Sequence, residues 1–372
     1  MIRREAIADL VTRARREVDE GLLPGCQLAV GYQGELVAAE TIGEAPAGND
    51  SRYVMFSCTK AIVVSAVWQL LAEGAIALGD HVGDHIPEFK TNGKDAITVE
   101  QVLLHTSGFP HAPLGPPQWD TREGRLQAFS RWRLNWEPGS RFEYHATTAH
   151  WVLAELLERS DGVDFRQAVR NRVIDPLGLQ HLRLGVPPDE QGDIALVRHV
   201  GEAPTAAELE ALLGVPSLDV GEVTEAALSG FAEAQTMAVG VPGGGGITSA
   251  GDLALFYQGL LNNPDGLWDA GWLARATGEV RNTFPDLMTG VPVNRSIGVV
   301  IAGDNPSMRG FGHGNGPRAF GHDGAGGQLA WGDPDSGVSF AYLTNGLDRN
   351  VIRQWRRNVG INSRAAAVAV AN

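Results

Sequence analysis

An apolar run near the start of the chain sets the strongest constraint on its fold. Residues 61–71 contain only Ser65 and Gln69 as polar side chains, so a helix formed from them is apolar on nearly every face. Gly74 follows as a helix stop. The run therefore predicts a helix that is buried inside the protein, with other elements packed around it.

The residues directly before this run pair a hydroxyl with an amine. In the sequence FSCTK, residues 56–60, Ser57 and Lys60 are three residues apart, which puts them on one face of a helix, one turn apart. The chain has only three lysines, so the pair is informative. It is typical of a nucleophile beside its base, provided that burial lowers the lysine pKa. An N-cap serine with a surface lysine is the structural alternative.

Composition and charge exclude several classes of partner. The chain has 372 residues, 43% hydrophobic and 20% charged, which predicts a soluble globular protein with two lobes or one large domain. A net charge of -14, without a basic run, argues against nucleic acid and anionic membranes as partners. No segment has the pattern of an export signal or a membrane span. With Cys26 and Cys58 expected as reduced thiols, the prediction is a cytoplasmic protein.

The two ends of the chain carry the strand signals. Strands are predicted at 26–32 and 35–42 around Gln33-Gly34, at 296–302, and at 328–332 and 338–344 around a turn at 333–337. Apolar residues at helical spacing predict a helix from Ile2 to about Glu20. A closing helix is predicted near Asn350 to Val359, followed by a small-residue tail that frays.

The middle of the chain is predicted to be helices and long loops. Thr98 has capping-box spacing, and helices are predicted at 147–159 and 164–173. The four glycines at 243–246 lack the pattern of a phosphate-binding loop. They predict close backbone packing before a helix that is capped by Thr248 or Ser249 and runs to about Leu261.

These elements assemble most simply into an α+β fold. Both chain ends form one antiparallel sheet, terminal helices cover it, and the middle forms a largely helical lobe. We expect residues 1–78 and 242–372 to form the sheet lobe and residues 79–241 the helical lobe. A cleft follows between them, and the Ser57 helix leaves the sheet region at that boundary.

A serine nucleophile needs a second proton carrier for the leaving group, and the middle lobe offers Tyr144 in the sequence WEPGSRFEYHA. With this residue the chain resembles the serine β-lactamase and penicillin-binding-protein superfamily, in particular the class C β-lactamase-like esterases (family VIII-type carboxylesterases). Ser57-x-x-Lys60 matches the first motif of that family. Tyr144-His145-Ala146 stands where its Tyr-x-Asn motif is expected, and His322-Asp323-Gly324 where its Lys-Thr-Gly motif is expected.

The resemblance implies a role for each of these residues. Ser57 would attack an acyl carbonyl, while Lys60 and Tyr144 share the proton transfers; which of the two is the base stays open. The backbone N–H groups of Ser57 and Ala325 would form the oxyanion hole. His322, Asp323, Gly324 and Ala146 would contact the substrate. Neither a cofactor nor a metal is implied.

Two departures from the family pattern bear on the substrate. Ala146 replaces an asparagine that helps to position the substrate amide in β-lactamases, and His322-Asp323 replaces the residues that help to hold the substrate carboxylate. Both argue against efficient β-lactam turnover and favour small carboxylic esters, with a purely structural His322 as the alternative reading.

Other functions share the same motifs. A D-amino-acid peptidase or amidase, or an acyltransferase that passes the acyl group to an alcohol, would look the same at Ser57, Lys60 and Tyr144. A catalytically silent binding protein is disfavoured because all three residues are present. An α/β-hydrolase would need Gly-x-Ser-x-Gly, which no serine here satisfies. The sequence leaves the oligomeric state unknown.

Overall fold

The computed structural model describes residues 1–218, 221–286, 290–304 and 311–369. Its helices are α1 (Arg4–Asp19), α2 (Thr59–Glu73), α3 (Val82–His85), α4 (Val99–Leu103), α5 (Arg122–Arg131), α6 (Thr148–Asp161), α7 (Phe165–Val169), α8 (Ala206–Leu213), α9 (Glu225–Phe231), α10 (Ala234–Val239), α11 (Ala250–Asn262), α12 (Ala270–Gly278) and α13 (Val351–Ala366). Its strands are β1 (Gly25–Tyr32), β2 (Glu35–Gly43), β3 (Tyr53–Val54), β4 (Arg183–Leu184), β5 (Arg198–Val200), β6 (Gly246–Thr248), β7 (Val300–Ile301), β8 (Phe320–Gly321), β9 (Leu329–Asp333), β10 (Val338–Thr344) and β11 (Gly346–Asp348).

The main sheet joins the two ends of the chain. Its strand order is β2-β1-β10-β9-β8-β7, and each neighbouring pair is antiparallel. The central pairing brings Cys26 opposite Thr344 and Tyr32 opposite Val338. Both predicted hairpins are present, and Gln33 and Gly34 form the first turn with φ of 54° and 84°, the left-handed values that a two-residue hairpin turn requires. The α+β prediction is therefore confirmed.

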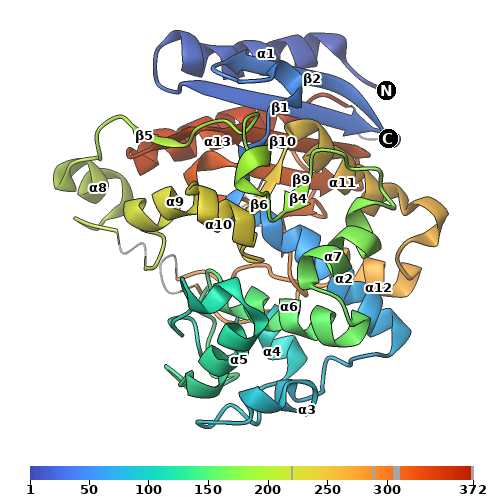
Figure 1. Ribbon diagram of the computed structural model, residues 1–372. Coiled ribbons are helices and arrows are strands. Elements are labelled where there is room, and N and C mark those ends of the chain that lie inside the picture. The colour runs from blue at the N-terminus through green and yellow to red at the C-terminus, as the bar shows by residue number, and fades with distance from the viewer. Residues whose placement is uncertain (219–220, 287–289, 305–310, 370–372) are drawn as a thin grey trace.

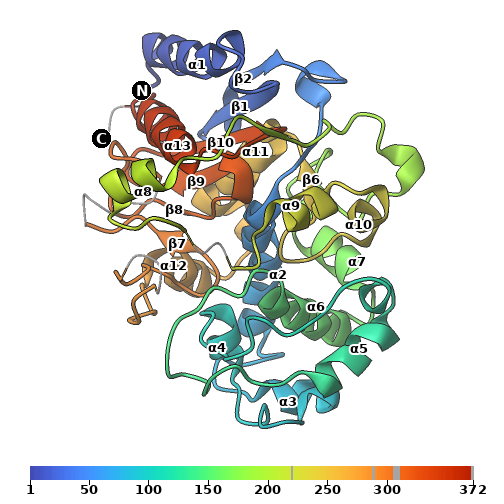
Figure 2. The same cartoon turned by 90° about the vertical axis from the view of Figure 1, so that its left-hand side faces the viewer.

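Helices cover both faces of this sheet (Figure 2). Phe340 and Tyr342 face a core shared with α1 and α13, while the alternating Ala341 and Leu343 face the larger core that includes α11. Because both faces are buried, β10 is apolar along most of its length instead of alternating with polar residues.

The α2 helix connects the sheet to the helical region below it in Figure 1. Nearly every residue from Thr59 to Leu71 is buried, as the apolar run predicts. Its largest side chain, Trp68, donates its indole N–H to the carbonyl of Ile297 at 2.8 Å. The helix also packs against α6 and α12, and Gly74 ends it in the left-handed conformation.

Two small sheets connect the middle of the chain to its ends. The strand β6 pairs antiparallel with both β3 and β4, and β5 pairs in parallel with β11. Because β4 and β5 lie within residues 79–241, this part of the chain contributes strands that pair with the flanking segments; the exact lobe boundaries stay a prediction. In the part of the chain that the structure describes, no helix is both long and apolar enough to cross a membrane.

The strand predicted at 296–302 is only partly correct. Just Val300 and Ile301 form strand β7. The residues before them fold into a tight turn, in which the Ser296 N–H donates to the Val299 carbonyl at 2.9 Å and Gly298 has a φ of 105°. The apolar pattern there reflects packing on α2, because a side chain at Gly298 would meet Val64.

The prediction for the C-terminal helix was too short. The α13 helix begins after its cap Asn350, as expected, but continues to Ala366. Ile361 and Ala365 on its last turns are fully buried against α1 and the sheet. Alanines carry too little side chain to show an amphipathic pattern, so no periodicity indicates that this segment packs.

Candidate active site

A short turn at residues 56–58 presents Ser57 at the start of α2. Phe56 has a φ of 45°, a strained value for a residue with a side chain. The turn is held by its neighbours: the Thr59 hydroxyl donates to the Phe56 carbonyl at 2.6 Å and accepts from the Gly246 N–H at 2.9 Å. Ser57 is half-buried, whereas the residues around it are buried. Its hydroxyl is therefore both accessible and fixed in place.

Lys60 is buried and lies beside this hydroxyl. Its Nζ is 3.2 Å from the Ser57 Oγ, 2.7 Å from the Ala146 carbonyl and 2.5 Å from the Gly243 carbonyl. Burial, and then the charge of Arg295, hold the pKa of Lys60 well below its ordinary value. The lysine predicted from the pattern is thus an internal amine and not a surface residue.

Tyr144 reaches Ser57 from the loop before α6. Its hydroxyl donates to the Ser57 Oγ at 2.9 Å, and the Lys60 Nζ lies 4.9 Å from the centre of its ring. Burial raises the pKa of Tyr144 to about 12, although the charge of Arg295 opposes the rise. At neutral pH the phenol therefore keeps its proton.

The predicted third motif follows β8 and passes behind the Ser57 turn. A side chain at Gly324 would stand 2.5 Å from the carbonyl oxygen of Met55, so only glycine allows the two segments to approach this closely. Ala325 lines the same cavity as Ser57. Asp323 is exposed and does not line that cavity.

His322 is buried and neutral. Burial, and then the charges of Arg295 and Lys60, hold its pKa well below the ordinary value. Its Nδ1 lies 2.8 Å from the Asp323 carbonyl, which can only accept, so Nδ1 carries the proton. The Nε2 atom is then an acceptor, and it has no partner among the described residues.

The glycine run and Ala146 meet at Lys60. A side chain at Gly243 would lie 2.9 Å from the Ala146 carbonyl, so this glycine lets both carbonyls reach the same amine. This agrees with the predicted close backbone packing. The predicted cap is also present, because the Ser249 hydroxyl accepts from the Asp252 N–H at the start of α11. Ala146 thus contributes its backbone, where the family asparagine would contribute a side chain.

Two residues near Tyr144 have no role in the sequence prediction. Arg295 is buried, its guanidinium lies 5.6 Å from the centre of the Tyr144 ring, and its Nε and Nη1 have no partner among the described residues. His105 stacks on the Tyr144 ring, with the two ring centres 5.0 Å apart and the ring planes at 17° to each other. His105 stands in the stretch LLHTSG that resembles the family, but Arg295 lies in an irregular segment and gave no signal.

A cavity of about 360 Å³ opens in front of Ser57. Apolar side chains on its wall include Phe56, Trp119, Leu228 and Phe231, the last two from α9. Ala146, Gly243 and Ala325 also line it, together with two exposed glutamates, Glu222 and Glu233. Neither lysine nor arginine is among the described residues of the wall. Of the tryptophans Trp119, Trp132 and Trp136, only the first lines the cavity.

Both cysteines of the chain are buried. Cys58, next to the serine, is fully buried, and burial raises the pKa of its thiol, so it serves packing, as expected. Cys26 and Cys58 are free thiols. Among the residues that the structure describes, no group of three or more His, Cys, Asp or Glu side chains is arranged to hold a metal ion.

The sequence is similar to known proteins over most of its length. The family model described as Beta-lactamase matches residues 9–360. Esterase/beta-lactamase LipL of Mycobacterium tuberculosis is 30% identical over 351 residues, covering 87% of this chain and 77% of that protein.

Two solved structures share the fold. A penicillin-binding-protein homologue from Caulobacter crescentus has a TM-score of 0.77 at 26% identity, covering 98% of this chain and 97% of that one. A family VIII carboxylesterase also has a TM-score of 0.77, at 23% identity, with 97% of each chain covered.

Proposed function

The chain belongs to the beta-lactamase family, and on that premise we propose that it is a serine hydrolase that cleaves small carboxylic esters through an acyl-enzyme at Ser57. The observation that carries the proposal is the pair of contacts at the Ser57 Oγ, 3.2 Å from the Lys60 Nζ and 2.9 Å from the Tyr144 hydroxyl. A hydroxyl between an internal amine and a phenol has both a base and a proton donor in reach.

Lys60 is the base in the acylation step. Its lowered pKa favours the neutral amine, which has two N–H groups and one lone pair. The Ala146 and Gly243 carbonyls accept the two N–H groups, which leaves the lone pair for the Ser57 proton. As Ser57 attacks the ester carbon, the oxyanion forms against the backbone N–H groups of Ser57 and Ala325.

Tyr144 is the proton donor to the leaving group. With a pKa of about 12 it holds its proton at neutral pH, and it passes that proton to the ester oxygen, which departs as an alcohol. The phenolate then takes the proton from the Lys60 ammonium, which restores both groups. Water attacks the acyl-enzyme in turn, Lys60 takes its proton, and the same proton returns to Ser57 as the acid leaves.

The wall of the cavity supports a neutral ester as substrate. A substrate with a carboxylate, such as a β-lactam, needs a cation to balance its charge, and the cavity instead presents Glu222 and Glu233. Ala146 and His322 also favour an ester, since both depart from the family pattern that holds a β-lactam. Because one relative is named esterase/beta-lactamase, the test below includes both an ester and a β-lactam.

The two glutamates also favour a second candidate. An amide of a D-amino acid carries a free ammonium, which Glu222 or Glu233 would attract. In that case the same Ser57, Lys60 and Tyr144 would release an amine in place of an alcohol. A transferase would differ only in the acceptor that enters after the alcohol leaves.

The first experiment measures hydrolysis of p-nitrophenyl acetate and butyrate. We expect turnover by the wild type and none by Ser57→Ala. Ser65→Ala is the matched control, because Ser65 lies on the same helix with its hydroxyl bonded to the Ile62 carbonyl at 2.8 Å; it should keep its activity. If the wild type neither hydrolyses an ester nor reacts with a fluorophosphonate, the hydrolase proposal is wrong.

A second experiment separates the substrate classes. Esters, D-amino-acid amides and nitrocefin are offered with and without added alcohol or amine, and mass spectrometry follows the Ser57 adduct and the products. We expect esters to acylate fastest and nitrocefin to be a poor substrate. Nitrocefin turnover equal to that of the best ester would contradict the interpretation that Ala146 and His322 disfavour β-lactams. Amide turnover faster than ester turnover would favour the amidase.

A further inference from the structure

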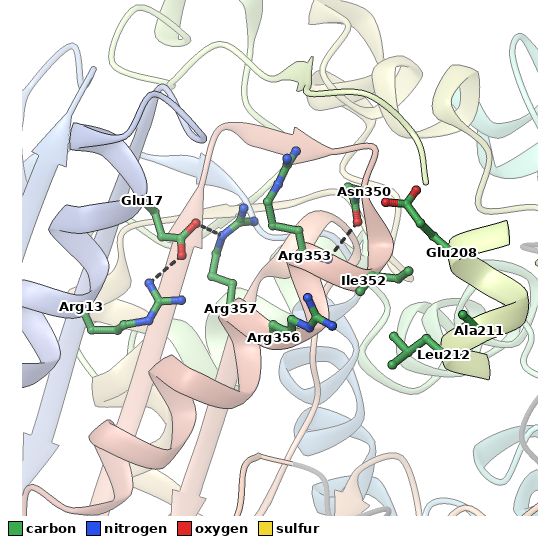
Figure 3. A pocket seen from close by; sticks show the side chains of 10 residues that line it. All are labelled: Arg13, Glu17, Glu208, Ala211, Leu212, Asn350, Ile352, Arg353, Arg356 and Arg357. Carbon is green, nitrogen blue, oxygen red and sulfur yellow. Dashed lines mark hydrogen bonds and ion pairs between the residues drawn. The ribbon is translucent and has the colours of Figure 1, made fainter. Parts of the chain in front are cut away.

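A second cavity, of about 510 Å³, lies away from Ser57, between α1, α8 and the first turns of α13. Figure 3 shows it from close by. Four arginines line it, Arg13 from α1 and Arg353, Arg356 and Arg357 from α13. In a chain with a net charge of -14, this is an unusual concentration of positive charge, and it lies at a helix N-terminus, where the helix dipole adds to it.

Part of this charge is neutralised inside the protein. Arg357 is 1% exposed, and it donates from Nε to Glu17 at 2.7 Å and from Nη2 to Asp348 at 2.6 Å. Asp348 also holds Arg353, and Glu17 also holds Arg13. Two carboxylates therefore serve three arginines, so the cluster keeps an excess of positive charge.

One arginine on the wall of the cavity has no carboxylate partner among the described residues. The exposed side chain of Arg356 has no ion pair in the described part of the chain. Glu208 on the opposite wall stays ionised, because the N–H and hydroxyl of Thr205 donate to its carboxylate and lower its pKa. With Glu17 and Asp348 it makes three carboxylates for four arginines, so one positive charge remains.

Beside Glu208, the α8 wall of the cavity is apolar. Ala211 and Leu212 of α8 face Ile352 of α13 across the cavity (Figure 3). Leu212 is 50% exposed, so an apolar group in the cavity would cover surface that now faces water. A ligand that satisfies both walls has an anionic group at one end and a small apolar body at the other.

We propose that this cavity binds a small amphipathic anion, a phosphate or carboxylate attached to a compact apolar group. The anionic oxygens bond the exposed Arg356 guanidinium beside the partly exposed Arg353, since guanidinium groups match the geometry of both oxyanions. The apolar body lies against Leu212 and Ile352. The site is separate from Ser57 and does not depend on the hydrolase proposal.

The test is a titration of the full chain, at constant ionic strength, with inorganic phosphate, phenyl phosphate and phenylacetate, read by calorimetry and by thermal unfolding. We expect saturable binding of a phenyl anion at least tenfold tighter than that of phosphate, because the ring covers Leu212. Comparison of phenyl phosphate with phenylacetate assigns the anionic group. Binding by Ser57→Ala should equal that of the wild type; its loss there would place the anion at the serine and overturn the proposal.

Two variants test the two walls without touching the buried ion pairs. Arg356→Gln removes an exposed charge, and Leu212→Glu places a carboxylate on the apolar rim. Each should weaken binding of the phenyl anion at least tenfold. Arg131→Gln is the control, because Arg131 is exposed on α5, outside the cavity, and the charge change is the same. Equal affinity in Arg356→Gln and Arg131→Gln, or no saturable binding by the wild type, would contradict the site.

Discussion

The two fully buried lysines of the chain, Lys60 and Lys94, differ in their hydrogen-bond partners. Lys60 and Lys94 are both fully buried, and both donate to backbone carbonyls. Lys94 completes its hydrogen bonds with two carbonyls and the hydroxyl of Thr91, so it holds a loop. Only Lys60 has a serine hydroxyl as its third partner.

The two lysines therefore make a matched pair of variants. Lys60→Met should lower kcat/KM for p-nitrophenyl butyrate by about 10²- to 10⁴-fold, the usual contribution of a general base. Lys94→Met should leave kcat per folded molecule unchanged within about twofold, while it destabilises the protein by about 1 to 3 kcal/mol through carbonyls that lose their donor. Rates are normalised to the folded fraction from denaturant titration. Equal losses of kcat would argue against a distinct role for Lys60.

We expect Arg295 to set the pH range of the proposed reaction. Its charge lowers the pKa of Lys60 and opposes the rise in that of Tyr144. Replacing it by methionine raises both pKa values, so the acidic limb of kcat/KM, where Lys60 loses its proton, moves to higher pH, and the alkaline limb moves the same way. Arg295→Lys keeps the charge and should restore the wild-type profile. A profile that stays in place in Arg295→Met would show that the charge does not act on the dyad.

At the scale of elements, the site depends on close approaches between backbones. The Ser57 turn, the glycine run before α11 and the segment after β8 come from distant parts of the chain, and each contact point has a glycine: Gly246 beside Thr59, Gly243 beside Ala146 and Gly324 beside Met55. Side chains at these positions would push the elements apart. The glycines thus fix how the elements assemble.

Gly324→Ala tests this assembly. A methyl group there would meet the Met55 carbonyl, so the turn that carries Ser57 must shift away from Ala325. We expect kcat/KM to fall by about 10²-fold, as a misplacement of about 1 Å does, with KM less affected than kcat. Gly278→Ala, which has open space around it, should keep full activity. Steady-state kinetics with p-nitrophenyl butyrate measure both, and an active Gly324→Ala would refute the close approach.

At the scale of the whole molecule, the two chain ends form one unit. Strand β1 pairs with β10, α1 packs on α13, and the Arg3 N–H donates to the Val368 carbonyl at 2.8 Å. The ion pairs of Arg357 with Glu17 and Asp348 connect the same segments. Both ends of the chain therefore contribute to the sheet that supports α2, and we expect its stability to depend on both.

A pair of substitutions on the last turns of α13 measures this dependence. Ile361→Ala removes a fully buried side chain between α13 and the sheet and should lower the free energy of unfolding by about 2 to 5 kcal/mol. Val359→Ala, at a position that is 42% exposed, should change it by less than about 0.5 kcal/mol. Guanidinium denaturation monitored by tryptophan fluorescence gives both values. A small effect of Ile361→Ala would mean that the end of α13 does not support the sheet.

Local patterns in the sequence predict much of this molecule because they encode local structure. The hairpin at Gln33-Gly34, the capping box at Thr98 and the buried run of α2 each depend on neighbouring residues. The Ser57, Lys60 and Tyr144 contacts were predicted from the motifs and their family resemblance. Arg295 could not be found in this way, because its position over Tyr144 results from the tertiary fold. The end of α13 is missed because its alanines show no amphipathic pattern.

The pairing of β1 with β10 also determines when the fold can be completed during synthesis. The ribosome completes β1, Ser57 and Lys60 early, but Ala325 and β10 emerge hundreds of residues later. Until then the nascent chain carries an apolar strand with an open edge, and Ser57 lacks the segment that holds Ala325. We therefore expect a chain that is interrupted before residue 338 to associate through that open edge and to show no activity, instead of a reduced activity.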